Sequence, residues 1–204
     1  TFTADGTTNT AGHGLGVKPD VVMIRRRSDA SGPGMILLTD LINGSQDYGY
    51  MHIADNFDDI GYAVHTSSLV EYNDTNATTQ VGYAFTQIQG FSKFGSYIGI
   101  ENADGVYVHL GFRPAWLLIK VASSDGKNWH IYDNKRLGYN VDNNMSRANL
   151  NSADQTDDDI DLLANGFKIR RNTSALCDAG ETIVYWAIAE APFVNSNGVP
   201  ANAR

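Results

Sequence analysis

The side chains that could carry out chemistry are scattered along this chain and form no recognised catalytic motif. The five histidines show no His-x-x-x-His spacing that would place two imidazoles on one metal ion. No serine lies in a Gly-x-Ser-x-Gly elbow. Two carboxylates from different strands could converge for glycoside hydrolysis, but no pattern among the four glutamates and the aspartates supports such a pair. The sequence therefore predicts a protein that is not an enzyme.

An acidic run at residues 157–161 is the best candidate for a metal site, because Ca²⁺ prefers oxygen ligands. The run lacks the turn glycine and the distal glutamate of an EF-hand, so a solvated acidic loop is the favoured interpretation. Residues 142–144 are a second place to look for a divalent ion. We expect no bound cofactor. The weak metal candidates are Asp157, Asp158, Asp159 and Asp161.

Aromatic side chains beside turn residues form a candidate carbohydrate site. Exposed tyrosine and tryptophan rings stack on the C–H groups of pyranose rings, while neighbouring amides bind the hydroxyls. The alternative is that the same rings pack in the core or at its rim. The candidates for glycan binding are Tyr48, Tyr50, Trp129, Tyr132 and Tyr139.

The charge balance argues against two classes of partner. The chain has 204 residues and a formal net charge of -8, so we expect no general attraction to nucleic acid or to an anionic membrane. No apolar run approaches the length of a membrane span. The basic cluster Arg25-Arg26-Arg27 could bind a partner subunit or an anionic glycan, but it is better explained as the solvent-facing end of a strand. Cys177 is the only cysteine, which excludes an internal disulfide.

Short β-strands are the elements that must position these residues. Apolar runs alternate with turns rich in Gly, Asn and Asp, whereas weak helical patterns occur only near residues 144–150 and 158–163. Many short strands joined by such turns predict an all-β fold of the sandwich or barrel type. The clearest predicted strands are residues 21–24, 35–38, 81–85, 106–108, 116–121, 129–132, 167–170 and 183–188.

One sequence pattern occurs twice in the chain. Residues 15–25 align without a gap on residues 110–120, and both segments begin with a Leu-Gly-x-basic-Pro signature. The same offset places Phe2 on Tyr97. Such agreement in order and residue type indicates an internal duplication.

The repeated pattern predicts two domains. In the closing strands, Tyr83 of the first copy aligns with Tyr185 of the second, with an offset that has grown through loop insertions. Each copy has about a hundred residues, which is the usual size of a small sandwich. We therefore expect two tandem β-sandwich (jelly-roll-like) units at residues 1–95 and 96–204; a single sandwich built from two interlocked halves is the alternative.

The signature itself has a structural explanation. Proline fixes φ and lacks a donor, so it suits the first position of a strand. The preceding basic residue, Lys18 or Arg113, is held extended by the proline. Gly16 and Gly111 permit a close approach or a positive φ just before it. We interpret the signature as the start of a buried strand and not as a binding site.

Several blocks of the chain also resemble a domain of unknown function that occurs in tail-fibre-like and other virion-associated proteins of bacteriophages, many of them marine. The first copy departs from that family where Met-Ile-Leu-Leu at residues 35–38 replaces the usual tryptophan-containing strand. The match extends over essentially the whole chain. The blocks that carry the resemblance are residues 12–28, 90–97, 103–105, 111–116, 189–193 and 201–204.

This resemblance implies a place in a virus particle and no reaction. It implies a non-enzymatic virion structural protein, exposed near the C-terminal end of a tail fibre or spike that contacts host-surface glycan. Fibres of this kind are commonly homotrimers, so a trimer is the expected oligomer, with other virion proteins as further partners. Since the chain starts within a strand-like segment, we expect it to be a piece of a longer protein.

Two alternatives stay open at the level of sequence. One is a capsid-decoration or head-fibre module whose partner is another virion protein. The other is a polysaccharide-degrading tailspike, against which the lack of an acid–base pattern counts. If the protein recognises a ligand, we expect the site in the regions that the two copies do not share, residues 35–50 and 128–150.

Overall fold

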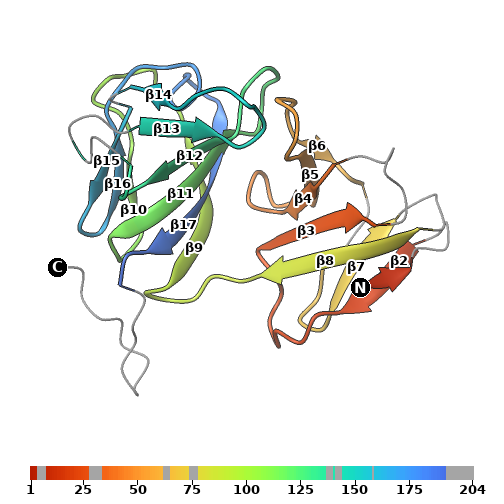
Figure 1. The fold of residues 1–204 in the computed structure, drawn as a ribbon. Helices are drawn as coiled ribbons and strands as arrows, with labels where there is room; N and C mark the ends of the chain where they lie inside the picture. Colours follow the sequence, from red (N-terminus) through yellow and green to blue (C-terminus); the bar gives the residue numbers. More distant parts are fainter. Residues whose placement is uncertain are drawn as a thin grey trace. The chain divides into compact units, whose positions relative to one another are not determined.

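The computed structural model describes residues 1–3, 8–27, 34–61, 65–73, 78–136, 140, 144–157 and 159–191, and all regular elements among them are β-strands (Figure 1). The prediction of an all-β, sandwich-like fold is therefore confirmed. The two weak helical patterns were wrong, because they fall on β13 (Asn144–Arg147) and β15 (Ile160–Leu163). In β15 burial alternates from residue to residue, as it does in a strand with one face in the core.

The chain divides into two compact units, one formed by Thr1–Ile53 with Phe57–Thr86 and the other by Ala54–Asn56 with Gln87–Arg204. The division lies at Thr86, before the expected boundary at Gly95. Gly95 lies inside β9 (Ser92–Ile98), which pairs along its whole length with β17 (Thr182–Ala189) of the second unit. The ladder of hydrogen bonds, and not the start of the sequence repeat, therefore sets the boundary.

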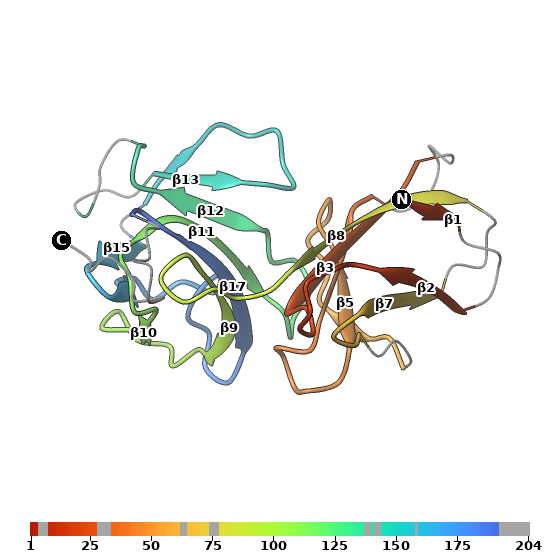
Figure 2. The same cartoon turned by 90° about the horizontal axis from the view of Figure 1, so that it is seen from below.

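The first unit has a large antiparallel sheet and a two-stranded sheet. The large sheet has the order β1 (Phe2–Thr3), β8 (Thr79–Phe85), β3 (Val21–Arg26), β4 (Ile36–Thr39), β5 (Asp47–Tyr50), β6 (Asp58–Asp59). In Figure 2, β2 (Thr8–Gly12) and β7 (Leu69–Asn73) form a layer apart from β3 and β8. Alternate residues of β3 and β4 meet Val70 and Tyr72 of the small sheet in one core.

The second unit repeats this architecture and has a third strand in its small sheet. Its large sheet has the order β14 (Gln155–Thr156), β13, β12 (His130–Asp133), β11 (Pro114–Val121), β17, β9, and its small sheet has the order β10 (Tyr107–His109), β16 (Gly166–Ile169), β15. Phe167 of the small sheet lies fully buried between the rings of Tyr97 and Tyr185, with centroids 6.1 and 5.5 Å away in edge-on geometry. Burial of one such side chain contributes about 1.5–3 kcal/mol.

The two large sheets share one topology. Counted from the edge that holds the first strand, the order β1–β8–β3–β4–β5–β6 corresponds strand for strand to β9–β17–β11–β12–β13–β14. The pair β2–β7 corresponds in the same way to β10–β16. Every sheet is built from strands of one half of the chain, as the expectation of two tandem units requires and an interlocked single sandwich would not allow. The shared order supports the internal duplication.

The alignment of the closing strands needs a correction by one residue. Tyr83 lies opposite Met23 in the β3–β8 pair, and Trp186 lies opposite Leu118 in the β11–β17 pair. Since Met23 and Leu118 are equivalent in the aligned signatures, Tyr83 corresponds to Trp186 and not to Tyr185. A one-residue slip places a strand residue on the opposite face, and Tyr185 accordingly points into the core.

The glycines of the two signatures have the same backbone conformation. Gly16 has a φ of 74° and Gly111 a φ of 82°, so both occupy the left-handed region that side chains disfavour. A Cβ at Gly16 would meet no atom within 4 Å, and one at Gly111 would lie 3.9 Å from the nearest. The positive φ, and not a close approach, is therefore what requires glycine at these positions.

The basic residue of each signature makes an ion pair. Lys18 pairs with Asp40. Arg113 Nε lies 3.4 Å from Glu190 Oε2 at the end of the closing strand. These pairs hold the start of the central strand to a neighbouring segment, in agreement with a structural role for the signature.

Candidate functional site

A partly open pocket on the second unit is the best candidate for a binding site. Its volume is about 490 Å³, and it lies where the segment before β9 meets the segment around the end of β10. Pockets of this size are typical of small-ligand sites. The lining residues are Gln87, Gln89, Gly90, Ser92, Lys93, His109, Leu110, Gly111 and Phe112.

One wall of the pocket is a tight turn that precedes β9. The backbone N–H groups of Phe91 and Ser92 both donate to the carbonyl of Ile88 at 2.9 Å, and the N–H of Ile88 donates back to the carbonyl of Ser92 at 3.1 Å. Gly90 has a φ of 75°, which the turn requires. This turn leaves the Gln89 side chain exposed at the pocket.

The opposite wall is the end of β10 and the second signature. The N–H groups of Leu110 and Gly111 both donate to the carbonyl of Asn165, at 2.8 and 3.1 Å, which fixes the turn. Leu110 and Phe112 are only 6% and 4% exposed, so their side chains anchor this wall in the core. His109, the last residue of β10, is exposed. The signature thus contributes to the site through its position.

Lys93 joins the two walls. Its Nζ donates a 2.7 Å hydrogen bond to the backbone carbonyl of His109. An ammonium group has three donors, so it keeps capacity for a ligand oxygen. The His109 ring in turn lies beside Tyr107, with centroids 6.4 Å apart.

Exposed apolar side chains lie within two residues of the pocket lining in the chain, although they are not lining residues themselves. Ile88, Phe91 and Tyr107 are 51%, 41% and 46% exposed. The combination of amides, an ammonium group and exposed rings suits a polyhydroxylated ligand, whose hydroxyls take hydrogen bonds while its C–H faces contact the rings. Carboxylates are absent from the described lining residues, so the pocket lacks the paired acids of a glycosidase.

Two of the aromatic residues expected to bind glycan are buried, and this expectation is corrected. Trp129 and Tyr132 are each 1% exposed, so neither ring can stack on a ligand. The backbone N–H of Trp129 donates to Oδ1 of Asn149 at 3.0 Å. Tyr132 points into the core of the second unit.

The tyrosines of β5 pack at the rim of the first core. Tyr48 and Tyr50 are half-buried, and their rings meet edge to face with centroids 5.6 Å apart. Both pack against the cluster formed by β3, β4 and β7. Tyr139, the fifth candidate, lies outside the described residues. None of the four described aromatics belongs to the pocket, which lies outside residues 35–50 and 128–150 where we expected the site.

The acidic run is neutralised by two arginines. Asp157 and Asp159 both approach Arg171 Nη1, at 2.5 and 3.5 Å, and Asp161 lies 3.2 Å from Arg170 Nε. Asp158 lies outside the described residues. The described part of the chain contains no group of three or more His, Cys, Asp or Glu side chains arranged to hold a metal ion. The three described aspartates act as ion-pair partners in this structure.

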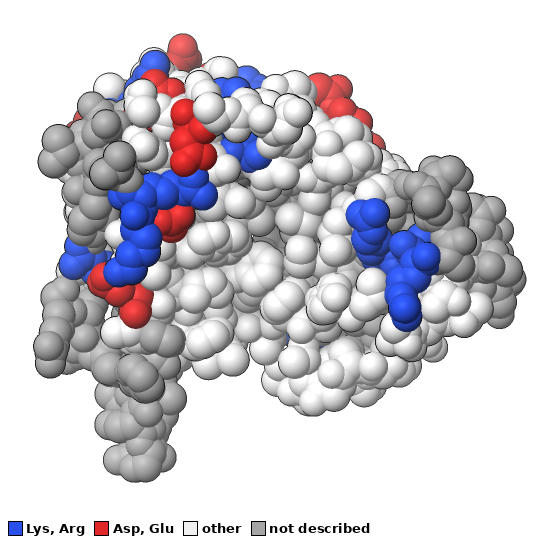
Figure 3. Space-filling model, viewed as in Figure 1, with Lys and Arg blue, Asp and Glu red and all other residues white. Residues whose placement is uncertain are grey.

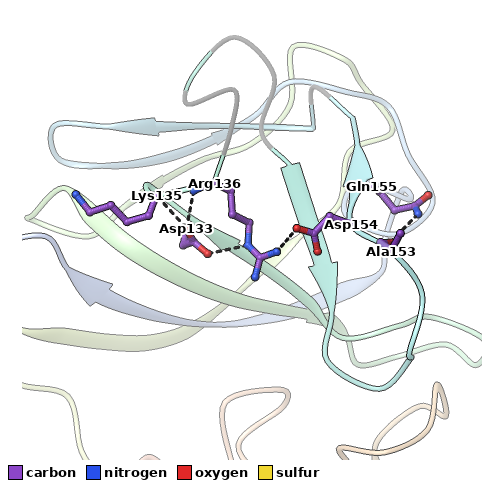
Figure 4. Close-up of polar contacts among 6 residues, drawn as sticks. All are labelled: Asp133, Lys135, Arg136, Ala153, Asp154 and Gln155. Carbon is purple, nitrogen blue, oxygen red and sulfur yellow. Dashed lines mark hydrogen bonds and ion pairs between the residues drawn. The ribbon is translucent and has the colours of Figure 1, made fainter.

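The segment after the second signature strand is also closed by charge pairs (Figure 4). Asp133 accepts hydrogen bonds from the backbone N–H groups of Lys135 and Arg136 at 2.9 Å and from Arg136 Nε at 2.8 Å. The Arg136 guanidinium also pairs with Asp154 just before β14. Arg136 therefore connects the β12 turn with the edge of the sheet, which makes this region a structural clasp.

The basic cluster lies at the end of β3. Arg25 and Arg27 are exposed, and Figure 3 shows Lys and Arg side chains gathered on this unit. The Arg27 N–H donates to the carbonyl of Thr79 at 2.7 Å, which extends the ladder to β8. The alternation of exposed and half-buried residues agrees with the interpretation of a strand end that faces solvent.

Two histidines are buried, and their burial favours the neutral imidazole. His65 and His130 are each 3% exposed, and burial, together with nearby Lys18 for His65 and Arg147 for His130, lowers the pKa of each to about 4. Neither belongs to the pocket. Both are buried polar residues of their units.

The pocket was missed at the level of sequence because its walls come from segments with no common pattern. The Gln-x-Gln of residues 87–89 has no motif of its own, and Leu110-Gly111-Phe112 was assigned to the start of a strand. The available signal was a short segment, residues 87–91, that mixes polar and apolar residues without periodicity between two clearly predicted strands. Loops of this kind often carry function.

Comparison with known proteins adds a family and no further relatives. Residues 1–192 match the family described as Domain of unknown function (DUF7483). No curated protein and no solved structure matches the chain. Among the described residues there is no helix with the length and apolar character needed to cross a membrane.

Proposed function

The chain belongs to the DUF7483 family, and from this premise we propose that it is a non-enzymatic structural protein of a phage virion that contacts host-surface glycan through the pocket of the second unit. The observation that carries the glycan proposal is the pocket itself, with its amides and Lys93 around a partly open space and the exposed Phe91 and Tyr107 within two residues of the lining. The resemblance of the sequence blocks to phage fibre-like proteins supports the virion location.

The chemistry of the pocket favours recognition over cleavage. Cleavage of a glycosidic bond needs an acid and a second carboxylate on either side of the bond. The described lining residues offer amide, hydroxyl, ammonium and imidazole groups instead. A glycan bound there would be held and released unchanged. We propose a homo-oligomeric fibre with a trimer as the expected state, because the fibres that the sequence resembles are commonly homotrimers. In such an oligomer several weak sites would gain avidity through their high effective concentration.

Glycan-array binding of the full chain tests this proposal. We expect binding that is weakened about tenfold or more by Gln89→Ala, Lys93→Ala or Phe91→Ala, since each removes one polar or stacking contact. Tyr83→Ala is the matched control, because Tyr83 is an exposed aromatic residue of the first unit, 50% accessible, and does not line the pocket. Thermal unfolding of each variant confirms that the fold is intact.

Three results would contradict the proposal in different ways. Equal losses in Tyr83→Ala and Phe91→Ala would show that the pocket is not the site. Release of reducing ends from host polysaccharide would identify a tailspike enzyme. Binding to purified capsid, without binding to cells or glycans, would identify a decoration module.

A further inference from the structure

Two aspartates lie directly opposite each other on neighbouring strands of the first unit. Asp47 of β5 pairs with Asp59 of β6 in the antiparallel register, and Asp58 is next to Asp59 in the chain. Like charges in facing positions of a ladder destabilise the pair. Lys18 forms its ion pair with Asp40. The sheet edge therefore concentrates negative charge.

Asp47 is the buried member of this group. Its side chain is 3% exposed, and its Oδ2 has no hydrogen-bond partner among the described residues. A buried carboxylate oxygen without a hydrogen-bond partner is costly, since this atom has lost its water and has gained no hydrogen bond in exchange. Burial, with Asp59, Asp40 and Asp58 adding repulsion, raises the pKa of Asp47 to about 6. Among the described residues, no cationic group is a cause of the shift in this pKa.

We propose that Asp47 and Asp59 bind a divalent cation, with Ca²⁺ as the best match. The buried, unpartnered oxygen supplies one ligand, and the facing carboxylate on β6 supplies a second. Both are hard oxygen donors. They suit Ca²⁺ better than Zn²⁺, which prefers nitrogen and sulfur ligands. Ca²⁺ also accepts irregular coordination completed by water and backbone carbonyls, whereas Mg²⁺ demands a near-ideal octahedron.

The small number of carboxylates sets the expected affinity. The described residues hold no group of three acidic, His or Cys side chains around one point, so the ion would keep several water ligands. Asp59 is exposed, and its Oδ1 already accepts a 2.7 Å hydrogen bond from the N–H of Gly61, which leaves Oδ2 for the ion. We expect a Kd of about 10⁻⁴ to 10⁻³ M, the range of extracellular Ca²⁺ modules.

Thermal unfolding of the full chain with CaCl₂ or MgCl₂, at pH 7.5 and constant ionic strength, tests the site. We expect millimolar Ca²⁺ to raise the Tm of the first unit by about 5 °C, and Mg²⁺ to raise it less. The first unit can be followed separately. Its transition contributes to circular dichroism, whereas tryptophan fluorescence reports the second unit alone, because Trp116, Trp129 and Trp186 all lie there.

Charge-neutralising variants identify the ligands. Asp47→Asn and Asp59→Asn should each abolish the Ca²⁺ shift, and Asp47→Asn without Ca²⁺ should be at least as stable as the wild type. Glu71→Gln on β7 is the control, since it removes one charge from the other sheet of the same unit and should keep the full shift. If Asp47→Asn fails to fold, the exposed Asp59→Asn decides.

The proposal is overturned if Ca²⁺ leaves the Tm of the wild type unchanged, or if Asp59→Asn keeps the full shift. A wild type that is stabilised only by lowering the pH toward 6, and not by Ca²⁺, would show that a proton and not a metal ion relieves the pair. This inference does not depend on the glycan pocket, which lies in the other unit. Loss of glycan binding and loss of the Ca²⁺ shift are therefore separate outcomes.

Discussion

The hydroxyl of Tyr132 donates a 3.0 Å hydrogen bond to Oδ2 of Asp159 inside the second unit. Tyr132 is 1% and Asp159 3% exposed, so this contact between β12 and the segment before β15 is shielded from water. Burial, followed by the adjacent Asp159 carboxylate, raises the pKa of Tyr132 well above its usual range. Burial also raises the pKa of Asp159.

Removing this hydroxyl should destabilise the second unit without affecting the glycan binding that we propose. Tyr132→Phe leaves the Asp159 carboxylate with Arg171 as its remaining described side-chain partner, at 3.5 Å. We expect a loss of about 1–3 kcal/mol in the free energy of unfolding. Urea unfolding followed by tryptophan fluorescence measures it. An unchanged free energy of unfolding would show that the hydrogen bond makes no net contribution to stability.

Acidification should destabilise the second unit through His130. Its pKa is about 4 when folded and 6.5 when exposed, so between these values the unfolded chain binds more protons. Stability is full above pH 6.5 and falls by up to about 3 kcal/mol as the pH approaches 4. His130→Gln should flatten this slope in denaturant titrations, whereas the exposed-site control His109→Gln should keep it. Equal slopes in both variants would assign the acid sensitivity elsewhere.

Alanine at the signature glycines should cost each unit a similar amount. A Cβ at Gly16 or Gly111 would clash with no neighbour. The loss in the free energy of unfolding for Gly16→Ala or Gly111→Ala should therefore come from the positive φ and be about 1–2 kcal/mol. Gly12→Ala is the control, because Gly12 lies in β2 without a positive φ and a Cβ there would be 3.9 Å from its nearest neighbour. A loss at Gly12 as large as at Gly16 would contradict this explanation. The measurement is chemical unfolding at one temperature.

The Arg136 clasp should contribute modestly and in a salt-dependent way. Arg136→Ala removes contacts to both Asp133 and Asp154, and we expect a loss of about 1 kcal/mol at low ionic strength. The loss should shrink in 1 M NaCl. Arg170→Ala, which removes a single exposed pair with Asp161, should cost less. Equal costs for both variants would show that Arg136 does not act as a clasp.

Strand positions were predictable from sequence because short apolar runs are separated by turns rich in Gly, Asn and Asp. The central strands β3 and β11 read as apolar runs behind a proline, and both lie in the middle of a sheet. The repeat also predicted two units. Which face a residue occupies was harder to predict, since a shift of one position reverses it, and Tyr83 was therefore aligned with the wrong neighbour.

The candidate site could not be predicted because it depends on which turns meet. Residue type alone did not distinguish a buried Trp129 from an exposed ring, and both interpretations fit its polar neighbours. The pocket joins residues 87–93 to residues 109–112 through Lys93 and the His109 carbonyl. Asp47 and Asp59 face each other only because β5 and β6 are neighbours in the sheet. Neither juxtaposition has a signal in local sequence.

In both units the first strand is hydrogen-bonded to the last, β1 to β8 and β9 to β17. A module whose two ends emerge from adjacent strands can be copied end to end, because a short connector joins one copy to the next without disturbing any ladder. Gene duplication then needs no refolding of the ancestral unit. The same geometry would allow copies to diverge independently, one acquiring an ion site at its edge and the other a recognition pocket beside its connector.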